Sequence, residues 1–266
     1  ERMLDLVNPS NLNKRKKRAK KAGRLFGFAI SPYLECTGGG PKEFASVKFV
    51  TDGSVELAVG SQSTGMGHET SLPQLLAARL GIEFNNIKFI QADTKATPIG
   101  GGHGGSRGME LGGNAVNQVA NQIIEKAINF AAYLLQSNTS MISFKNGQFK
   151  DDASGASISM EEVIKASLGD NRLPESFELD SLNTETIFER NDISIPNGCH
   201  AAAVEVDPET GTVKITDYWV VDDFGTIINP LLADGQVMGG VAQGIGQALL
   251  ENIIYDPDSG QLITGS

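Results

Sequence analysis

Gly100-Gly-Gly-His-Gly-Gly-Ser-Arg-Gly108 is the stretch of sequence around which the rest of the chain is organised. Six of its nine residues are glycine, and a long apolar helical pattern begins soon after it. Glycine permits tight turns and close approach to the backbone, and free amide N–H groups at a helix start bind anions. The stretch therefore predicts a ligand-holding loop, with a plain surface loop of glycines as the alternative.

Two further glycine-containing turns also lie at or inside predicted helix starts. They are Thr64-Gly-Met-Gly-His68 and Gly239-Gly-Val-Ala-Gln-Gly-Ile-Gly246. Three such turns in one chain indicate one shared ligand. Because backbone N–H groups would supply most of the contacts, we expect a polar, extended, partly anionic ligand that brings its own reactive centre.

Paired strands around an acidic, glycine-containing turn occur twice in the chain. The first pair surrounds Asp52-Gly53 and the second surrounds Pro208-Glu-Thr-Gly211, and a loop and a helix follow each pair. We therefore predict an α+β fold of two similar hairpin-plus-helix subdomains, residues 1–170 and 171–266, with mixed sheets packed against helices.

Local signals predict several other elements. Leu25–Ile30 is typical of a buried strand, and apolar spacing predicts a long helix over about Glu110–Gln136. Asn146-Gly147 predicts a hairpin, and Ser159 with Glu162 predicts a capping box. A helix that contains Pro73 is expected to begin no earlier than about residue 70, because a proline without an N–H is harmless only in the first turn.

The charge distribution is uneven. The chain has 266 residues and a formal net charge of −10, yet seven of its 22 basic residues lie within Lys14–Lys21. Without these seven, the rest of the chain carries −17, which argues against a nucleic-acid surface elsewhere. We interpret the basic run as a solvated helix face or a linking arm rather than a nuclear signal or nucleic-acid patch.

Cysteine content and hydropathy indicate the compartment. Cys36 and Cys199 lie far apart, so the sequence encodes neither a disulfide framework nor an iron–sulfur cluster in this chain. No apolar run reaches the length of a membrane span, and the N-terminus lacks a signal-peptide pattern. We expect a soluble, cytoplasmic protein that is a piece of a longer one.

Other functional motifs fit poorly. Gly65-Met-Gly-His-Glu-Thr70 imitates a dinucleotide fingerprint, but it lacks the third glycine and follows a hairpin strand. Gly104-Gly-Ser-Arg-Gly108 has the register of a nucleophile elbow but no buried apolar strand precedes it. No stretch supplies a phosphate-loop lysine, and the three histidines lack metal-ligand spacing, so we predict no metal held by side chains.

Several motifs in order along the chain resemble the large subunit of the molybdenum hydroxylases, the family of xanthine dehydrogenase, aldehyde oxidase and carbon monoxide dehydrogenase. The resemblance is to the second molybdopterin-binding domain and covers nearly the whole chain. It is specific because the motifs agree together. They are Gly60-x4-Gly65-Met-Gly-His-Glu-Thr70, Leu80-Gly-Ile82, Asp93-Thr94, Gly105-Ser-Arg107, Gly113-Asn-Ala-Val116 and Gly239–Leu249 with Glu251.

The resemblance implies a molybdenum–pterin cofactor, as molybdopterin or its cytosine dinucleotide, held by the three glycine-containing turns. The metal would be bound by the cofactor's own sulfurs. Carried over by motif, the cofactor-binding residues are Gly65, Met66, Gly67, Gly104, Gly105, Ser106, Arg107, Gln243 and Gly244.

Two departures from the family pattern matter. Met66 stands where the family usually has glutamine, so a side-chain hydrogen bond to the cofactor would be lost there. The chain also stops before the family's Gly-x-Gly-Glu segment, whose glutamate is the catalytic base. We therefore assign no catalytic residue in this chain and expect the fragment alone to be inactive.

The resemblance also implies a function for the full-length protein. It would be an oxidoreductase that hydroxylates an aldehyde or N-heterocycle with water as oxygen source. Its partners would be a small-molecule substrate and iron–sulfur and FAD-containing domains or subunits, and the full complex would be a homodimer. The alternative is a non-catalytic module that binds a phosphate or nucleotide through the same loops.

Overall fold

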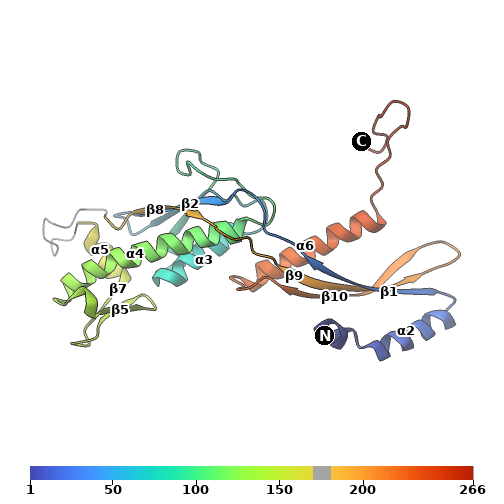
Figure 1. Ribbon diagram of the computed structural model, residues 1–266, viewed down its shortest axis with the longest axis horizontal. Helices are drawn as coiled ribbons and strands as arrows, with labels where there is room; N and C mark the ends of the chain where they lie inside the picture. The colour runs from blue at the N-terminus through green and yellow to red at the C-terminus, as the bar shows by residue number, and fades with distance from the viewer. Residues whose placement is uncertain (170–180, 266) are drawn as a thin grey trace. The chain divides into compact units, whose positions relative to one another are not determined.

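The computed structural model describes residues 1–169 and 181–265, which form two compact units (Figure 1). One unit comprises Glu1–Glu35 and Ile195–Ser266, and the other comprises Cys36–Ser194. The first 35 residues group with the C-terminal ones because β1 (Leu25–Leu34) pairs along its whole length with β9 (Asn197–Val206). The predicted division at residue 170 falls on residues 170–180, outside the described part of the chain, and stays a prediction.

The sheet of the 36–194 unit is mixed. Its order is β4-β3-β2-β8, and β3 pairs with β4 in parallel while the other pairs are antiparallel. The Asp52-Gly53 hairpin is confirmed, with Val47 opposite Leu57 and both side chains buried. The bounds of the four strands are β2 Lys42–Phe49, β3 Val55–Val59, β4 Ile87–Ile90 and β8 Thr184–Glu189.

Two helices pack against this sheet and form the main core. Figure 1 shows α3 (His68–Leu80) and α4 (Gly113–Leu134) beside the strands. Leu76 and Ile123 are fully buried in the cluster that joins helices and sheet. The predicted long helix is confirmed, but the α-helix begins later than predicted because residues Gly108–Gly112 form a wider π-helical turn (η2).

The expected start of α3 is wrong. The helix begins at His68 and contains Pro73 as its sixth residue. Gly67 adopts the left-handed region at φ 74°, which lets the chain turn directly into the helix, and the Ser71 N–H donates to the Gly67 carbonyl. The helix therefore tolerates the loss of the one backbone hydrogen bond that Pro73, which has no N–H, cannot donate.

A small second sheet extends this unit. The hairpin around Asn146 and Gly147 is confirmed, and both residues have positive φ, at 50° and 76°. The capping box is confirmed too, because the Ser159 hydroxyl accepts from the Glu162 N–H at 3.2 Å and a Glu162 carboxylate oxygen accepts from the Ser159 N–H at 2.9 Å. The elements are β5 Ile142–Lys145, β6 Gln148–Asp151, β7 Ser157–Ser159, α5 Met160–Ser167 and the 3-10 turns η1 Phe84–Asn86 and η3 Thr139–Met141.

The other unit is an antiparallel sheet in the order β1-β9-β10, where β10 is Val213–Asp223. Helices α1 (Arg2–Val7) and α2 (Pro9–Lys21) cover one face. The expectation that Leu25–Ile30 is a buried strand is wrong about burial, since Leu25 is 60% exposed. The reason is that α1 and α2 cover only one face of the three strands. The α+β class, with hairpins, helices and a mixed sheet, is confirmed.

Helix α6 (Pro230–Leu249) follows β10 in the chain. Asn229 caps it by accepting from the Leu232 N–H at 3.1 Å, and Pro230 occupies its first position. None of its residues is buried. Within the described residues, no helix combines the length and apolar character needed to cross a membrane.

Candidate functional site

The central glycine loop lies in the 36–194 unit, between β4 and the π-helical turn before α4. Its backbone is unusual at Gly104, where φ is 142°, and at Ser106, a non-glycine residue at φ 59°. A left-handed serine is rare and costs free energy that the surrounding structure must offset. Gly104, Gly105 and Ser106 are all exposed, so this strained part of the loop is accessible from outside.

Some glycines in the loop make room for the protein's own side chains. A Cβ atom added at Gly101 would collide with the Arg107 guanidinium, and one added at Gly108 would collide with the His68 ring. Gly65 and Gly104, by contrast, have positive φ and would place a Cβ in open space. The open glycines are therefore the ones that leave backbone accessible to a ligand.

Arg107 is anchored beneath the loop by Glu43. The two side chains are 3% and 0% exposed, and Arg107 Nη2 lies 3.3 Å from Glu43 Oε2 and donates to the Lys42 carbonyl at 2.8 Å. Glu43 also accepts from the Ser61 hydroxyl at 2.7 Å and from the Phe44 N–H at 3.0 Å. Both oxygens of the carboxylate thus accept hydrogen bonds from protein groups, which stabilises its charge despite its burial.

The guanidinium of Arg107 is only partly satisfied. Its Nε and Nη1 atoms are buried and have no hydrogen-bond partner among the described residues. Buried donors without an acceptor are rare because each costs about 1–3 kcal/mol. The arrangement therefore has two unused donors of a cationic group directly beneath the glycine loop.

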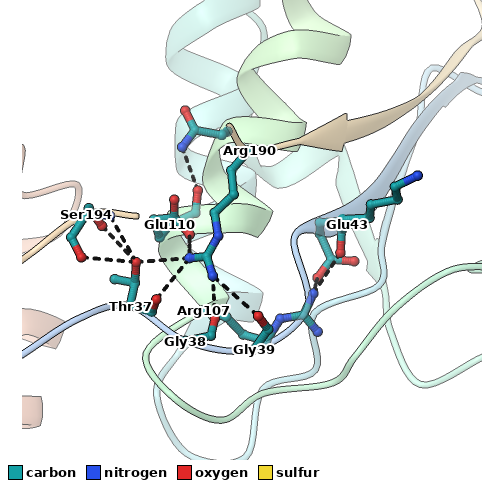
Figure 2. Close-up of polar contacts among 10 residues, drawn as sticks. Thr37, Gly38, Gly39, Glu43, Arg107, Glu110, Arg190 and Ser194 are labelled. Atoms are coloured by element: carbon teal, nitrogen blue, oxygen red, sulfur yellow. Dashed lines mark hydrogen bonds and ion pairs between the residues drawn. The ribbon is translucent and has the colours of Figure 1, made fainter. Parts of the chain in front are cut away.

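A second arginine fixes a neighbouring glycine loop, Thr37-Gly-Gly-Gly40 (Figure 2). Arg190 Nη1 donates to the Thr37 carbonyl at 3.1 Å and to its hydroxyl at 3.0 Å, and Nη2 donates to the carbonyls of Gly38 and Gly39, each at 3.3 Å. Glu110 pairs with the same guanidinium at 3.1 Å. Arg190 thereby gathers three successive carbonyls of one loop.

The two glycine loops are joined directly. The Gly38 N–H donates to the Gly105 carbonyl at 2.5 Å, and a Cβ at Gly39 would lie 2.8 Å from Arg107 Cδ. Sequence reasoning missed both Arg190 and the 37–40 loop. The run of three glycines at Gly38–Gly40 is visible in the sequence, whereas nothing near Arg190 in the sequence marks that residue.

The Gly65 turn also meets the central loop. Thr64 Oγ1 lies 2.9 Å from His103 Nε2, and the Thr64 N–H contacts Met66 Sδ at 3.2 Å. Within one unit, the structure thus brings together the turns that carry seven of the predicted residues, namely Gly65, Met66, Gly67, Gly104, Gly105, Ser106 and Arg107.

His68 lies where this turn enters α3. Burial lowers the pKa of its imidazole, and His103 adds to that effect while Glu69 opposes it. Its Nδ1 atom is buried without a hydrogen-bond partner among the described residues. A neutral ring fits this position, because a charged one would be poorly solvated.

The remaining two predicted residues lie on the other unit. Gln243 and Gly244 are exposed positions of α6. That all three turns line one site stays a prediction.

The sheet of that other unit carries a separate polar cluster. The Tyr33 hydroxyl donates to Asp222 Oδ1 at 2.9 Å, and burial together with this bond raises the pKa of Tyr33 to about 12. His200 Nε2 lies 3.3 Å from the same oxygen, and its Nδ1 lies 3.0 Å from the Tyr218 hydroxyl. These groups satisfy one another, so the cluster ties the three strands together.

No side-chain metal site is evident in the described ranges. They contain no group of three or more His, Cys, Asp or Glu residues able to hold a metal ion. A metal at the glycine loops would have to be held by something other than these side chains.

Comparisons with known proteins give a consistent result. A family model described as "Molybdopterin cofactor-binding domain" matches residues 2–266. The chain is 35% identical to the nicotine 6-hydroxylase large subunit of Paenarthrobacter nicotinovorans, over 98% of this chain and 34% of that protein. It is 30% identical to the carbon monoxide dehydrogenase large chain of Afipia carboxidovorans, over 91% of this chain and 32% of that protein.

Solved structures agree with these matches. Quinoline 2-oxidoreductase from Pseudomonas putida 86 superposes with a TM-score of 0.89 and 32% identity, covering 99% of this chain and 35% of that chain. The Cu,Mo-CO dehydrogenase gives a TM-score of 0.91 and 29% identity, covering 100% of this chain and 35% of that one. The chain therefore spans about a third of the length of these relatives.

Proposed function

The chain belongs to the molybdopterin cofactor-binding domain family of molybdenum hydroxylase large subunits, and from that premise we propose that its glycine loops hold a molybdenum–pterin cofactor. We further propose that the full-length protein is an oxidoreductase that hydroxylates an aldehyde or N-heterocycle with water as oxygen source. The chain covers only about a third of its relatives, so this activity is an inference about the larger protein.

The observation that carries the proposal is the unsatisfied guanidinium beneath the loops. Arg107 is buried and keeps Nε and Nη1 without a partner among the described residues, while Gly65 and Gly104 leave open backbone nearby in the same unit. The positive charge of the buried guanidinium would attract the anionic phosphate of a pterin, and the open backbone at Gly65 and Gly104 would offer it N–H donors. The residues present therefore fit the cofactor.

When bound, the cofactor would supply the redox centre at which substrate is oxidised. The chain's own contribution is binding and orientation. Backbone N–H groups at the open glycines would donate to the cofactor, and the positive charge of Arg107, fixed by Glu43, would favour its anionic part.

We propose Gly65, Met66 and Gly67, then Gly104, Gly105, Ser106 and Arg107, then Gln243 and Gly244, as the residues that contact the cofactor. Met66 would contribute backbone contact alone, because its sulfur already lies 3.2 Å from the Thr64 nitrogen. Arg107 would act from below the loop, since it is buried, whereas Ser106 and Gln243 are exposed.

The finer features of the complex are proposals that rest on the resemblance. We propose that the cofactor is molybdopterin or its cytosine dinucleotide and that iron–sulfur clusters and FAD lie on partner domains or subunits. One relative is named as the gamma subunit of the 6-hydroxypseudooxynicotine dehydrogenase complex, which supports such partners. We propose a homodimer of the full complex and, because the two cysteines, Cys36 and Cys199, lie far apart in the sequence, the reducing cytoplasm as its compartment.

Metal and pterin analysis of the full-length protein tests the proposal. We expect about one molybdenum per large subunit, together with a pterin released on denaturation. A protein with neither, carrying a nucleotide instead, would support the non-catalytic phosphate- or nucleotide-binding module. Nothing in the comparisons favours that alternative.

A further inference from the structure

We propose that the basic face of α2 is a docking surface for an acidic surface of a partner subunit in the complex. This inference rests on the partner subunits of the proposed function, but it concerns a different part of the chain from the cofactor loops. It starts from the six basic residues of α2 that the fold leaves exposed, which are Lys14, Lys16, Lys17, Arg18, Lys20 and Lys21.

Helix α2 packs against the sheet of its unit and is not a free linking arm. Ala19 is 1% exposed, and Leu12 packs into the small core of its unit. Arg15 binds Asp217 with both guanidinium nitrogens, one of them at 2.8 Å, and lies 5.8 Å from the centre of the Trp219 ring. One side of the helix is thus committed to the sheet, which fixes the direction of the other.

The exposed cations have no structural role that the fold reveals. None of the six forms an ion pair with any described residue. Lys14 and Arg18 are four residues apart, as are Lys17 and Lys21, so like charges adjoin on the helix surface and oppose its formation. The helix dipole favours cations in the last turn but not at Lys14 or Lys17. No ion pair among the described residues offsets this repulsion between like charges, so we attribute the exposed cations to binding.

Charge and packing decide which partner fits. The rest of the chain carries −17, which repels DNA, RNA and anionic lipid beyond the immediate surface of α2. The apolar residues of α2 already pack on its own sheet, so the helix has no second face to insert into a bilayer. A folded acidic protein surface can meet one helix face and leave the rest of the chain out of contact.

The triple variant Lys14→Gln, Lys17→Gln and Lys21→Gln tests the proposal. These residues follow helical spacing on the face opposite Ala19, and glutamine preserves helix propensity. The matched control replaces Lys145, Lys150 and Lys165, which are exposed lysines of the other unit, with glutamine. Association of the full-length large subunit with its purified iron–sulfur and flavin subunits is measured by surface plasmon resonance at several salt concentrations.

We expect the α2 variant to lower the association rate constant about tenfold at low salt and to flatten its salt dependence, with the control unchanged. The proposal would be overturned if the wild-type association rate constant did not depend on salt concentration, or if it were the same for wild type and the α2 variant. Lysine-dependent binding to phosphatidylglycerol vesicles or duplex DNA with subunit association unaffected would also overturn it. Molybdenum content is measured in the same samples, so failure of the cofactor proposal is seen separately.

Discussion

Arg107 and its glycine neighbours show how single residues shape the central loop. Gly101 lies against the guanidinium and Gly39 lies against the side-chain stem, so the loops wrap around a buried cation that Glu43 holds from below. Adding a side chain at one of these glycines should therefore disturb the loop more than adding one at a glycine that faces open space.

Gly101→Ala should lower the free energy of unfolding by about 1–3 kcal/mol, because its Cβ would displace Arg107 from a packed position. Urea unfolding at neutral pH measures the change. The control is Gly40→Ala, where φ is ordinary and no atom lies within 4 Å of the added Cβ. Equal stability of the two variants would show that Arg107 is not held as described.

Arg190 should be sensitive even to a conservative change. Arg190→Lys keeps the charge but loses the fork that binds three carbonyls, and should lower the free energy of unfolding by about 1–2 kcal/mol. Arg190→Met also leaves Glu110 unpaired and should lower it by about 3 kcal/mol.

The matched control for Arg190 is Arg24, which pairs with Glu205 at the surface. Arg24→Lys and Arg24→Met should each change the free energy of unfolding by less than about 1 kcal/mol. Arg190 variants that are no less stable than these controls would show that Arg190 does not hold the 37–40 loop.

His68 should make stability depend on pH. Burial lowers its pKa in the folded state, so the unfolded state binds the proton first as the pH falls. This stability is present above about pH 6.5 and is lost below it, by at most about 1.4 kcal/mol per pH unit. Urea unfolding at pH 7.5 and 5.5 should show this loss of stability in wild type and a smaller loss in His68→Gln. An identical loss in both proteins would contradict the role of His68.

At the scale of single elements, the sequence predicted what local chemistry decides. The Asp52-Gly53 and Asn146-Gly147 hairpins and the Ser159 capping box depend on residues only a few positions apart, and the structure confirms them. The start of α3 was misjudged, because Gly67 permits a turn whose advantage outweighs the hydrogen bond lost at Pro73.

The capping box at α5 gives a prediction at this scale. Ser159→Ala should lower the free energy of unfolding by about 1 kcal/mol, since the Glu162 N–H loses its acceptor. Ser157→Ala, two residues earlier and exposed, should change it by less than about 0.5 kcal/mol. Thermal unfolding of the two variants side by side measures the difference, and a smaller effect at Ser159 would refute the cap.

Part of the candidate site could be predicted and part could not. The Gly65 and Gly104–Arg107 turns carry recognisable motifs, and the structure places them in one unit joined by Thr64 and His103. Arg190 was not predictable, because it meets Thr37 across 153 residues of chain. Pairing over such distances depends on the whole fold rather than on local pattern.

At the scale of the whole molecule, the residues proposed to contact the cofactor are divided between the two units. The 36–194 unit supplies the Gly65 and Gly104–Arg107 turns, while α6, which carries Gln243 and Gly244, belongs to the other unit and has no buried residue. The pairing of β1 with β9 builds the sheet that precedes α6 from both ends of the chain. We therefore predict that Gln243 affects cofactor binding while contributing little to folding.

Molybdenum content of the full-length protein carrying Gln243→Ala tests this claim most directly, beside Gln236→Ala as an exposed control on the same helix. We predict that Gln243→Ala lowers the molybdenum bound per chain by about tenfold while its free energy of unfolding stays within about 0.5 kcal/mol of wild type, and that Gln236→Ala keeps full molybdenum content. Full molybdenum content in the Gln243→Ala protein would contradict it.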